Sequence, residues 1–371
     1  MATQDPVLLE RAFAVVAQGV RREAYAGAVA AVGDSNGIWE MRAFGMAAVE
    51  PDQVPMGTDT IFDLASLTKV VATTPAILRL LEEGAFVLET PVTHILPDFK
   101  DARVTMRHLL THTSGLPAWR ALYLDCQGWE EYMAAICAMP LVRDPGTQVE
   151  YSDLGFILLG GIIQRVTGQP LPEYCRRTVF EPLGMKCTWL PTVPNAAMAA
   201  TERGNQVEYG MCKERAEAFP RWRREVIWGE VNDGNAHYGL QGVSSHAGLF
   251  GTADDLARYA RAWLRKGEGM LGRYTVALAT RSHTTGLPGE NRGLGWQKPP
   301  TALFPNGRFN GGDMLSPAAF GHTGFTGTSV WIDPEKDLFA ILLTNRLHPV
   351  ATDGLFAVRP AFHNAVIATL Q

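Results

Sequence analysis

Segments with strand character lie near the two ends of this 371-residue chain, and helical patterns fill the middle. Near the start, the apolar runs Ala28–Val32 and Ile38–Phe44 flank an Asn-Gly pair, which is a hairpin signal. Near the end, Thr328–Ile332 and Leu338–Leu343 flank a turn-forming segment at residues 333–337. The sequence therefore predicts an α+β fold, in which both chain ends build one antiparallel sheet flanked by helices and the middle forms an inserted all-helical lobe.

The helical patterns divide this single unit, residues 1–371, into two expected subdomains. Residues 1–65 together with about 240–371 are expected to form the α/β subdomain, and about 66–239 the mainly helical one. Pro75 predicts a kink or an early end in its helix, and Pro360 suits the first turn of the closing helix. Apolar spacing predicts helices over residues 6–22, 66–83, 105–112, 129–138, 153–167, 171–180, 253–265 and 360–370.

Charge and hydropathy exclude two classes of partner. The 33 basic and 38 acidic residues give a net charge of −5, so no basic surplus is present to neutralise a phosphate backbone, and we expect no nucleic-acid partner. No apolar run reaches the roughly 18 residues that a membrane span requires, so no span is predicted. The sequence carries no signal for an oligomeric state.

The cysteines and the N-terminal residues bear on the cellular compartment. The five cysteines are odd in number and form neither a Cys-x-x-Cys pair nor a Cys/His cluster with zinc-ligand spacing, which favours a reducing compartment. The first residues include Asp5 and Glu10, and no basic start precedes an apolar stretch, so no signal peptide is predicted. We expect a cytoplasmic protein, although a secreted chain trimmed of its leader would begin in the same way.

Ser66 and Lys69 are three residues apart at the start of an apolar helical stretch, so their side chains share one face at the helix N-terminus. A serine hydroxyl becomes a good nucleophile when a base takes its proton, and a desolvated lysine with a lowered pKa can be that base. The positive end of the helix also favours negative charge developing at Ser66. The alternative is an N-capping serine beside a solvated lysine.

Tyr151, Ser152 and Asp153 come directly before the apolar helical run at residues 154–166. Either Ser152 or Asp153 can cap this helix. Capping does not account for Tyr151, whose phenol can relay a proton if a nearby lysine lowers its pKa.

His322, Thr323 and Gly324 precede a strand, within a segment of mostly small residues from Gly321 to Gly327. Small residues let a substrate approach the backbone, and N–H groups there can hold an oxyanion. The same residues equally fit a Gly-rich turn with a hydrogen-bonded histidine.

Other catalytic and cofactor signatures are absent from the sequence. His108 and His112 are four residues apart, but the glutamate of a His-Glu-x-x-His metalloprotease is missing, so no metal site is predicted. No Gly-x-Ser-x-Gly elbow is found, which argues against an α/β-hydrolase fold. Since no P-loop and no Gly-x-Gly-x-x-Gly fingerprint follows a strand, we expect no cofactor.

Taken in order, Ser-x-x-Lys at a helix start, Tyr-x-Asp in the helical lobe and His-Thr-Gly on a C-terminal strand resemble the serine β-lactamase and penicillin-binding-protein superfamily. The tyrosine points to the class C-like branch, which includes esterases and D-stereospecific peptidases. Further segments similar to that branch extend the resemblance over nearly the whole chain: residues 108–117, 181–185, 230–237, 246–250 and 293–296.

The resemblance implies a β-lactamase/transpeptidase-like fold and an acyl-enzyme mechanism. Ser66 would attack a carbonyl, Lys69 and Tyr151 would move its proton, and water would later release the acyl group. It also implies an oxyanion hole formed by the N–H groups of Ser66 and Phe325. The expected substrate contacts are Asp153, His322, Thr323 and Gly324.

Two residues depart from the pattern of the lactamases. His322 stands where many of them have a lysine, and a histidine near neutral pH is often uncharged, which makes β-lactamase activity a weaker expectation. Asp153 stands where lactamases and penicillin-binding proteins have an asparagine. A carboxylate does not donate to a substrate amide, and it can pair with Lys69 instead.

We therefore predict a serine hydrolase that needs no cofactor and cleaves a small ester or amide, with an esterase-like activity as the first choice. The alternatives with the same mechanism are a D-alanyl-D-alanine carboxypeptidase or D-aminopeptidase and a β-lactamase. The alternative of another class is a penicillin-binding sensor that becomes acylated on Ser66 without turnover.

The walls of the substrate pocket are the least constrained part of this prediction. Residues 201–235 fit no clean period and form either a long loop over a cleft or a surface excursion. His237 and His246 either line the pocket or make hydrogen bonds in the core or in loops. The aromatic candidates for the wall are Trp119, Trp222, Trp228 and Phe325.

Overall fold

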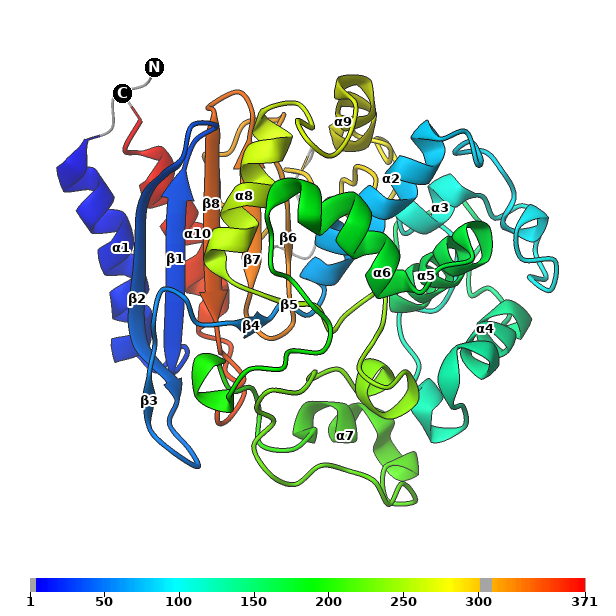
Figure 1. The fold of residues 1–371 in the computed structure, drawn as a ribbon, viewed down its shortest axis with the longest axis horizontal. Coiled ribbons are helices and arrows are strands. Elements are labelled where there is room, and N and C mark those ends of the chain that lie inside the picture. Colours follow the sequence, from blue (N-terminus) through cyan, green and yellow to red (C-terminus); the bar gives the residue numbers. More distant parts are fainter. Residues whose placement is uncertain (1–4, 301–308, 371) are drawn as a thin grey trace.

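A computed structural model describes residues 5–300 and 309–370, and the two chain ends share one sheet (Figure 1). Strands β1 and β8 pair antiparallel, with Ala28 opposite Thr344, so the predicted sheet of both ends is confirmed. The order across the six-stranded sheet is β3-β2-β1-β8-β7-β6. The strands are β1 (Gly27–Gly33), β2 (Ile38–Ala48), β3 (Val54–Pro55), β6 (Phe320–Thr323), β7 (Ser329–Asp333) and β8 (Leu338–Thr344).

The alternation of side chains along the strands gives the sheet two buried faces. Ala28, Ala30 and Val32 of β1 pack with helices α1 (Pro6–Arg21) and α10 (Leu355–Ile367). The residues between them, Val29 and Ala31, belong to the larger core, together with residues of α8 (Ala253–Leu264). Figure 1 shows α1 and α10 on one side of the sheet and α8 on the other.

Helices from the middle of the chain gather at the opposite side of the molecule from α1, as predicted for a helical lobe (Figure 1). Helix α5 is buried along most of its length and forms the centre of this group. The subdomain boundaries stay a prediction. The helices of this group are α2 (Thr74–Glu82), α3 (Met106–Leu110), α4 (Gly128–Ala138), α5 (Asp153–Thr167), α6 (Leu171–Cys175) and α7 (Gln206–Cys212), whereas α9 (Arg273–Thr280) follows α8 along the chain.

Three predicted elements differ from the structure. The helix predicted over residues 66–83 is divided, with a π-helical turn at Lys69–Thr73 before α2, and Pro75 lies in the first turn of α2. Helix α10 begins at Leu355, so Pro360 lies inside the helix. The burial of one face of α10 against the sheet outweighs the cost of the hydrogen bond that proline, which has no N–H, cannot make. The segment 201–235 contains the short helix α7.

A second, two-stranded sheet joins β4 (Phe62–Asp63) to β5 (Phe250–Gly251) directly before the Ser66 turn. The Leu64 amide adds a hydrogen bond to the Leu249 carbonyl at 2.8 Å. Strands of two residues are too short to show alternation in a sequence, which is why they were not predicted. They fix the start of the Ser66 segment to the body of the protein.

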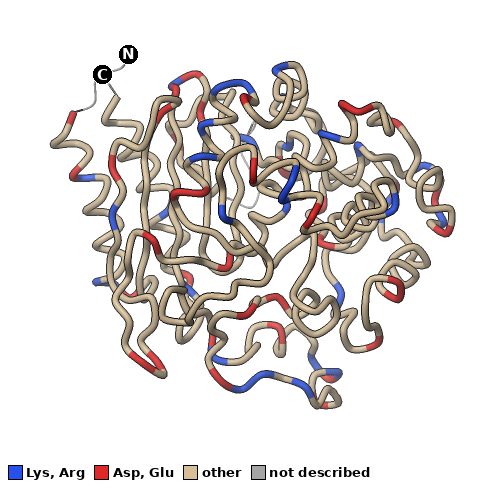
Figure 2. The backbone as a smooth tube through the Cα atoms, in the orientation of Figure 1, with Lys and Arg blue, Asp and Glu red and all other residues tan. Residues whose placement is uncertain are grey.

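Two further observations concern membrane-spanning helices and surface charge. No helix within the described ranges is long and apolar enough to cross a membrane. Basic and acidic residues are interspersed over most of the molecule, with a visibly basic run at the lower edge in the loops that follow α7 (Figure 2). In that run, the guanidinium of Arg223 donates to the backbone oxygens of Val231 and Asn232 and so helps to fix the loop.

Candidate active site

The predicted catalytic and substrate-contacting side chains meet at one cavity of about 450 Å³. Ser66 lines it from the start of the divided helix, Tyr151 from the loop before α5, and the His322 segment from β6 and the turn after it. Lys69 lies directly behind this wall and is completely buried. The other predicted residues that line the cavity are Asp153, Thr323, Gly324 and Phe325.

The turn that presents Ser66 is held from both sides. Ala65 adopts a positive φ of 46°, which is unusual for a residue with a Cβ and turns the chain sharply before Ser66. The Ala65 amide donates to Asp63 Oδ1 at 2.8 Å, and Thr68 Oγ1 donates to the Ala65 carbonyl at 2.6 Å. The strained conformation is therefore stabilised by its neighbours, as is common at functional sites.

Lys69 Nζ contacts three oxygen atoms. It lies 3.0 Å from Ser66 Oγ, 2.8 Å from the backbone oxygen of His246 and 2.7 Å from Asp153 Oδ1. An ammonium group has three N–H donors, so three acceptors match the charged form of Lys69.

The electrostatics around Lys69 correct one expectation. Burial lowers the pKa of Lys69, but the Asp153 carboxylate and the Tyr151 phenol outweigh it, and the pKa lies above its ordinary value. The expected lowered pKa of this lysine is therefore wrong for the resting protein. The reason is the carboxylate of Asp153, which stands at the position where the lactamases carry a neutral asparagine.

The loop before α5 fixes the ring of Tyr151. Ser152 caps α5 by accepting from the Gly155 amide, and its own amide donates to His112 Nδ1 at 3.0 Å. The His112 ring lies 4.5 Å from the Tyr151 ring, and the guanidinium of Arg292 lies 5.3 Å from it. These neighbours hold the phenol at the cavity wall.

The Tyr151 hydroxyl is buried beside Ser66 and Lys69, yet no residue in the described part of the chain makes a well-aligned hydrogen bond with it. Burial raises the pKa of Tyr151, and the charge of Lys69 opposes this without reversing it. The expected lowering of this pKa by lysine is thus outweighed by burial, and the phenol is protonated at neutral pH.

His322 and Thr323 form the end of β6, an edge strand of the main sheet that precedes β7. Burial lowers the pKa of His322 well below its ordinary value, with further lowering from Arg292 and Lys69, so this histidine is uncharged at neutral pH. Its Nδ1 contacts the Thr323 carbonyl at 2.8 Å. The positive charge that a lysine would bring to this position is absent.

Gly324 packs directly on the segment that presents Ser66. A Cβ on Gly324 would lie 2.1 Å from Thr328 Oγ1, 2.5 Å from the Leu64 carbonyl oxygen and 3.3 Å from the Ala65 Cβ. Because these distances are below van der Waals contact, the turn after β6 reaches Ser66 only with glycine here.

The two N–H groups expected in an oxyanion hole, those of Ser66 and Phe325, donate no hydrogen bond within the described ranges.

We predict that Gly324→Ala lowers the free energy of unfolding by about 1–3 kcal/mol, because the added methyl group forces the turn away from Leu64 and Ala65. Thermal unfolding followed by circular dichroism measures this as a lower Tm. Gly37→Ala is the matched control, since a Cβ there meets no atom within 4 Å. Equal losses in both variants would contradict the packing argument.

Of the expected aromatic wall, Trp119 and Phe325 line the cavity, and Phe325 is 41% exposed. The expectation for Trp222 and Trp228 is wrong. Trp222 packs with Tyr123 and donates to the Ala216 carbonyl, whereas Trp228 donates to the Met198 carbonyl. Both indoles satisfy their N–H groups away from the cavity.

The histidines singled out in the sequence have structural partners. His108 Nδ1 accepts from the Thr105 amide in a capping box, and His112 contacts Ser152 as described above. His237 lies near Glu230, with 3.5 Å between Nδ1 and Oε2. In the ranges 5–300 and 309–370, no three His, Cys, Asp or Glu side chains gather in a group that could hold a metal ion.

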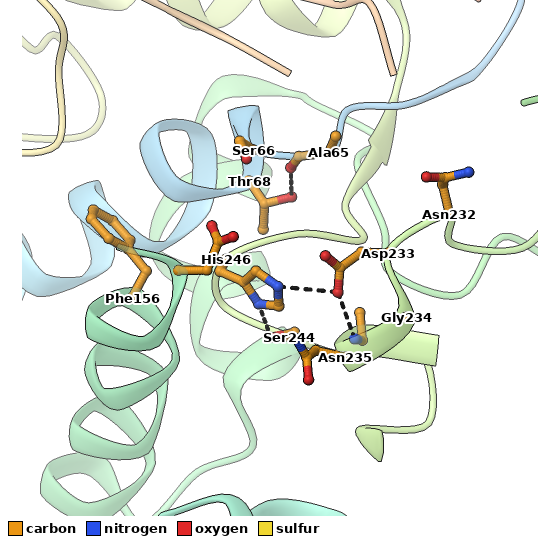
Figure 3. A network of polar contacts seen from close by, with 12 residues as sticks. Ala65, Ser66, Thr68, Phe156, Asn232, Asp233, Gly234, Asn235, Ser244 and His246 are labelled. Atoms are coloured by element: carbon orange, nitrogen blue, oxygen red, sulfur yellow. Dashed lines mark hydrogen bonds and ion pairs between the residues drawn. The ribbon is translucent and has the colours of Figure 1, made fainter. Parts of the chain in front are cut away.

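Several charged residues of the cavity were not predicted. Asp233 lines it and contacts His246, which in turn contacts Ser244 (Figure 3). The similar segments at residues 230–237 and 246–250 are a signal that points to this pair, but not to its contact across thirteen residues. The others are Glu208, Glu290, Arg292, Arg346 and Arg359.

Known proteins are similar to this chain over nearly all of the helices and strands described above. A sequence model of the family described as Beta-lactamase matches residues 12–359. The N-acetylmuramyl-L-alanine amidase of Bacillus subtilis (strain 168) is 34% identical over 322 residues, 80% of this chain and 70% of that protein. The putative D-alanyl-D-alanine carboxypeptidase of Escherichia coli (strain K12) is 33% identical over 318 residues, with 79% and 71% covered.

Solved structures show the same fold. EstCE1, a hydrolase with promiscuous acyltransferase activity, superposes with a TM-score of 0.73 at 24% identity, covering 97% of this chain and 98% of its own. A penicillin-binding protein homologue from Caulobacter crescentus gives a TM-score of 0.74 at 23% identity, with 99% of both chains covered. The predicted β-lactamase/transpeptidase-like architecture is confirmed.

Proposed function

The chain belongs to the β-lactamase family and is a serine hydrolase, and we propose that it cleaves a small ester or amide through an acyl-enzyme formed on Ser66. The observation that carries this proposal is the buried Lys69, whose Nζ lies 3.0 Å from Ser66 Oγ at the wall of the cavity. A nucleophile and a proton-transfer group within hydrogen-bond reach are the signature of covalent catalysis.

Lys69 begins the reaction as an ammonium ion, so it has to lose a proton before it can accept the proton of Ser66. In our proposal Asp153 takes that proton, because its carboxylate is 2.7 Å from Lys69 Nζ. The neutral amine then accepts the Ser66 proton while Oγ forms a bond to the substrate carbonyl carbon. The negative charge that develops on the carbonyl oxygen is held by the amides of Ser66 and Phe325.

Tyr151 completes the cycle in this proposal. Its protonated phenol donates to the leaving oxygen or nitrogen as the carbonyl is restored, and Lys69 returns a proton to the phenol. Water then attacks the acyl-enzyme by the reverse set of proton transfers. Uncharged His322, with Thr323 and Gly324, contacts the substrate on the side of β6, so recognition there rests on hydrogen bonds.

An ester is the first substrate class to test, but one observation favours an amide with a free carboxylate. Arg346 and Arg359 line the cavity, and neither forms an ion pair in the ranges that the structure describes; residues 301–308 contain no Asp or Glu. Burial and the charge of Arg346 lower the pKa of Arg359 to about 9. A substrate carboxylate would relieve this repulsion, which agrees with the carboxypeptidase reaction in the name of the E. coli relative.

Mass spectrometry of the intact protein tests the acyl-enzyme directly. We expect p-nitrophenyl acetate to give a transient adduct of one acetyl group, located by proteolysis on the peptide that contains Ser66, together with continuous release of nitrophenol. An adduct that persists without continued release, with this ester or with benzylpenicillin, would favour the sensor. Turnover without any adduct on Ser66 would overturn the proposal.

We also propose that the protein works in a reducing compartment such as the cytoplasm. All five cysteines are free thiols, and four of them are buried.

A further inference from the structure

The cavity wall beside the Ser66 turn is formed partly by the loop at residues 231–236, and its charged member is Asp233. Figure 3 shows the Asp233 carboxylate between the Ala65–Ser66 turn and the His246 ring. Asp233 Oδ1 accepts from the Ala236 amide at 2.8 Å and contacts His246 Nε2 at 3.1 Å. No hydrogen bond from the part of the chain that the structure describes reaches the second oxygen, Oδ2, and the side chain is 19% exposed.

The loop holds this carboxylate rigidly. The amide of Asn232 donates to Asp63 Oδ2 at 2.7 Å, and its side chain donates to Glu202 at 3.1 Å. His246 is fixed in turn by Ser244 Oγ at 2.7 Å from Nδ1 (Figure 3). Its backbone oxygen accepts from Lys69, so the loop is tied to the catalytic lysine. A charged group fixed at this precision is preorganised for binding, since no side-chain freedom is lost when a ligand arrives.

The other carboxyl groups of the cavity already have partners. Asp153 pairs with Lys69, and Glu290 pairs with Arg292. Glu208 accepts from the Gly234 amide and from the Tyr123 hydroxyl, and burial raises its pKa to about 8, so it is protonated at neutral pH. Asp233 differs from Asp153 and Glu290 because it has no Lys or Arg partner in the described ranges, and it differs from Glu208 because its pKa is lowered and not raised.

The groups that face Asp233 keep it ionised. His246 and the Ala236 amide hold the pKa of Asp233 below its ordinary value against the effect of burial, and Lys69 adds to this. Burial, with a smaller effect of the Asp233 charge, raises the pKa of the neighbouring Asp63 to about 6, so Asp63 is still mostly ionised at pH 7. Asp233 is therefore a fixed, ionised carboxylate of the cavity wall, and its Oδ2 is open to the substrate.

We propose that Asp233 is the binding site for a positively charged ammonium group on the acyl part of the substrate. This inference rests on the proposed function, and it names the substrate class as esters or amides of acids that carry a free amine. A purely structural carboxylate would need only the oxygen that meets His246 and Ala236. The open oxygen and the fixed loop instead match an N–H⁺ donor, for which a carboxylate is the strongest neutralising partner.

Matched methyl esters test this proposal. The substrates are the methyl esters of D- and L-alanine with a free amine and the same esters with an N-acetyl group, followed by acid release at pH 7 with the spontaneous rate subtracted. For the preferred enantiomer, we expect the wild type to favour the free amine by at least about tenfold in kcat/KM. In Asp233→Asn this ratio should fall by about tenfold, mainly through KM, and Asp233→Glu should restore part of it.

Asp254→Asn is the control for the loss of one carboxylate, because Asp254 is half-exposed on α8 and pairs with Arg258, and it should keep the ratio of the wild type. A wild type without preference for the free amine would overturn the inference, and so would an equal loss of Asp233→Asn on both esters. Hydrolysis of p-nitrophenyl acetate that depends on Ser66 then shows that the proposed function still holds. No hydrolysis of any ester that depends on Ser66 would overturn both.

Discussion

Ser66→Ala is expected to lower kcat/KM for a short-chain p-nitrophenyl ester by a factor of about a thousand or more at neutral pH. The variant lacks the oxygen that forms the bond to the carbonyl carbon, and in our proposal the neighbouring Tyr151 hydroxyl serves only to transfer a proton. Ser66 lies at the surface of the cavity, so removing its Oγ leaves no buried group unpaired except one donor of Lys69. We therefore expect a folded but inactive protein.

The assay compares wild type and Ser66→Ala purified side by side, with release of nitrophenol followed by absorbance. Ser35→Ala is the matched control, since Ser35 lies in the exposed hairpin turn and contacts Asp337 rather than the cavity. It should retain the rate of the wild type. If Ser66→Ala and wild type hydrolyse the ester at equal rates, hydrolysis does not proceed through Ser66 and the acyl-enzyme proposal fails.

The sheet and the proximity of Ser66 and Lys69 could be predicted from the sequence because each follows from a local pattern. The apolar run of β1 and the turn before β8 mark these two strands by composition alone. Because the segment between them is mainly helical, the strands at the two chain ends are left to pair with each other. Ser66 and Lys69 are neighbours on any helix. Gly324 could be singled out within a run of small residues, although its contact with Ala65 appears only in three dimensions.

What the sequence did not reveal depends on contacts between distant segments. The start of α10 at Leu355 is decided by burial against the sheet, which outweighs the preference of Pro360 for a first turn. The side chains of Trp222 and Trp228 find carbonyl partners that no spacing rule predicts. Likewise, Asp233 stands out only because the other carboxyl groups of the cavity have partners of their own. Those contacts join distant residues and cannot be read from one sequence.

The charge state of Lys69 is the clearest case of this kind, and it leads to the second large effect. Asp153→Asn should lower kcat/KM at pH 7 by about a hundredfold or more, within the usual range for a proton-transfer group. Asparagine keeps the shape of the side chain but cannot take the proton of Lys69. Loss of the carboxylate also leaves the buried lysine with burial as the dominant influence, so the pKa of Lys69 falls instead of lying above its ordinary value.

This change of sign gives the variant its own pH profile. Below the lowered pKa, Lys69 in Asp153→Asn is still protonated and has no internal acceptor for its proton, so the rate stays low. As the pH rises through that pKa, neutral lysine forms by release of the proton to solvent and the rate recovers. The wild type makes neutral lysine by transfer to Asp153 and should lack this recovery over the same range.

Initial rates of p-nitrophenyl acetate hydrolysis between pH 6 and 10, corrected for the spontaneous reaction, measure both profiles. Asp254→Asn is the control for a change of one charge, because Asp254 lies on the exposed face of α8 and pairs with Arg258. It should follow the wild type at every pH. A uniform loss in Asp153→Asn, with the profile of the wild type, would mean that Asp153 contacts the substrate without taking the proton of Lys69, and the relay would be wrong at this step.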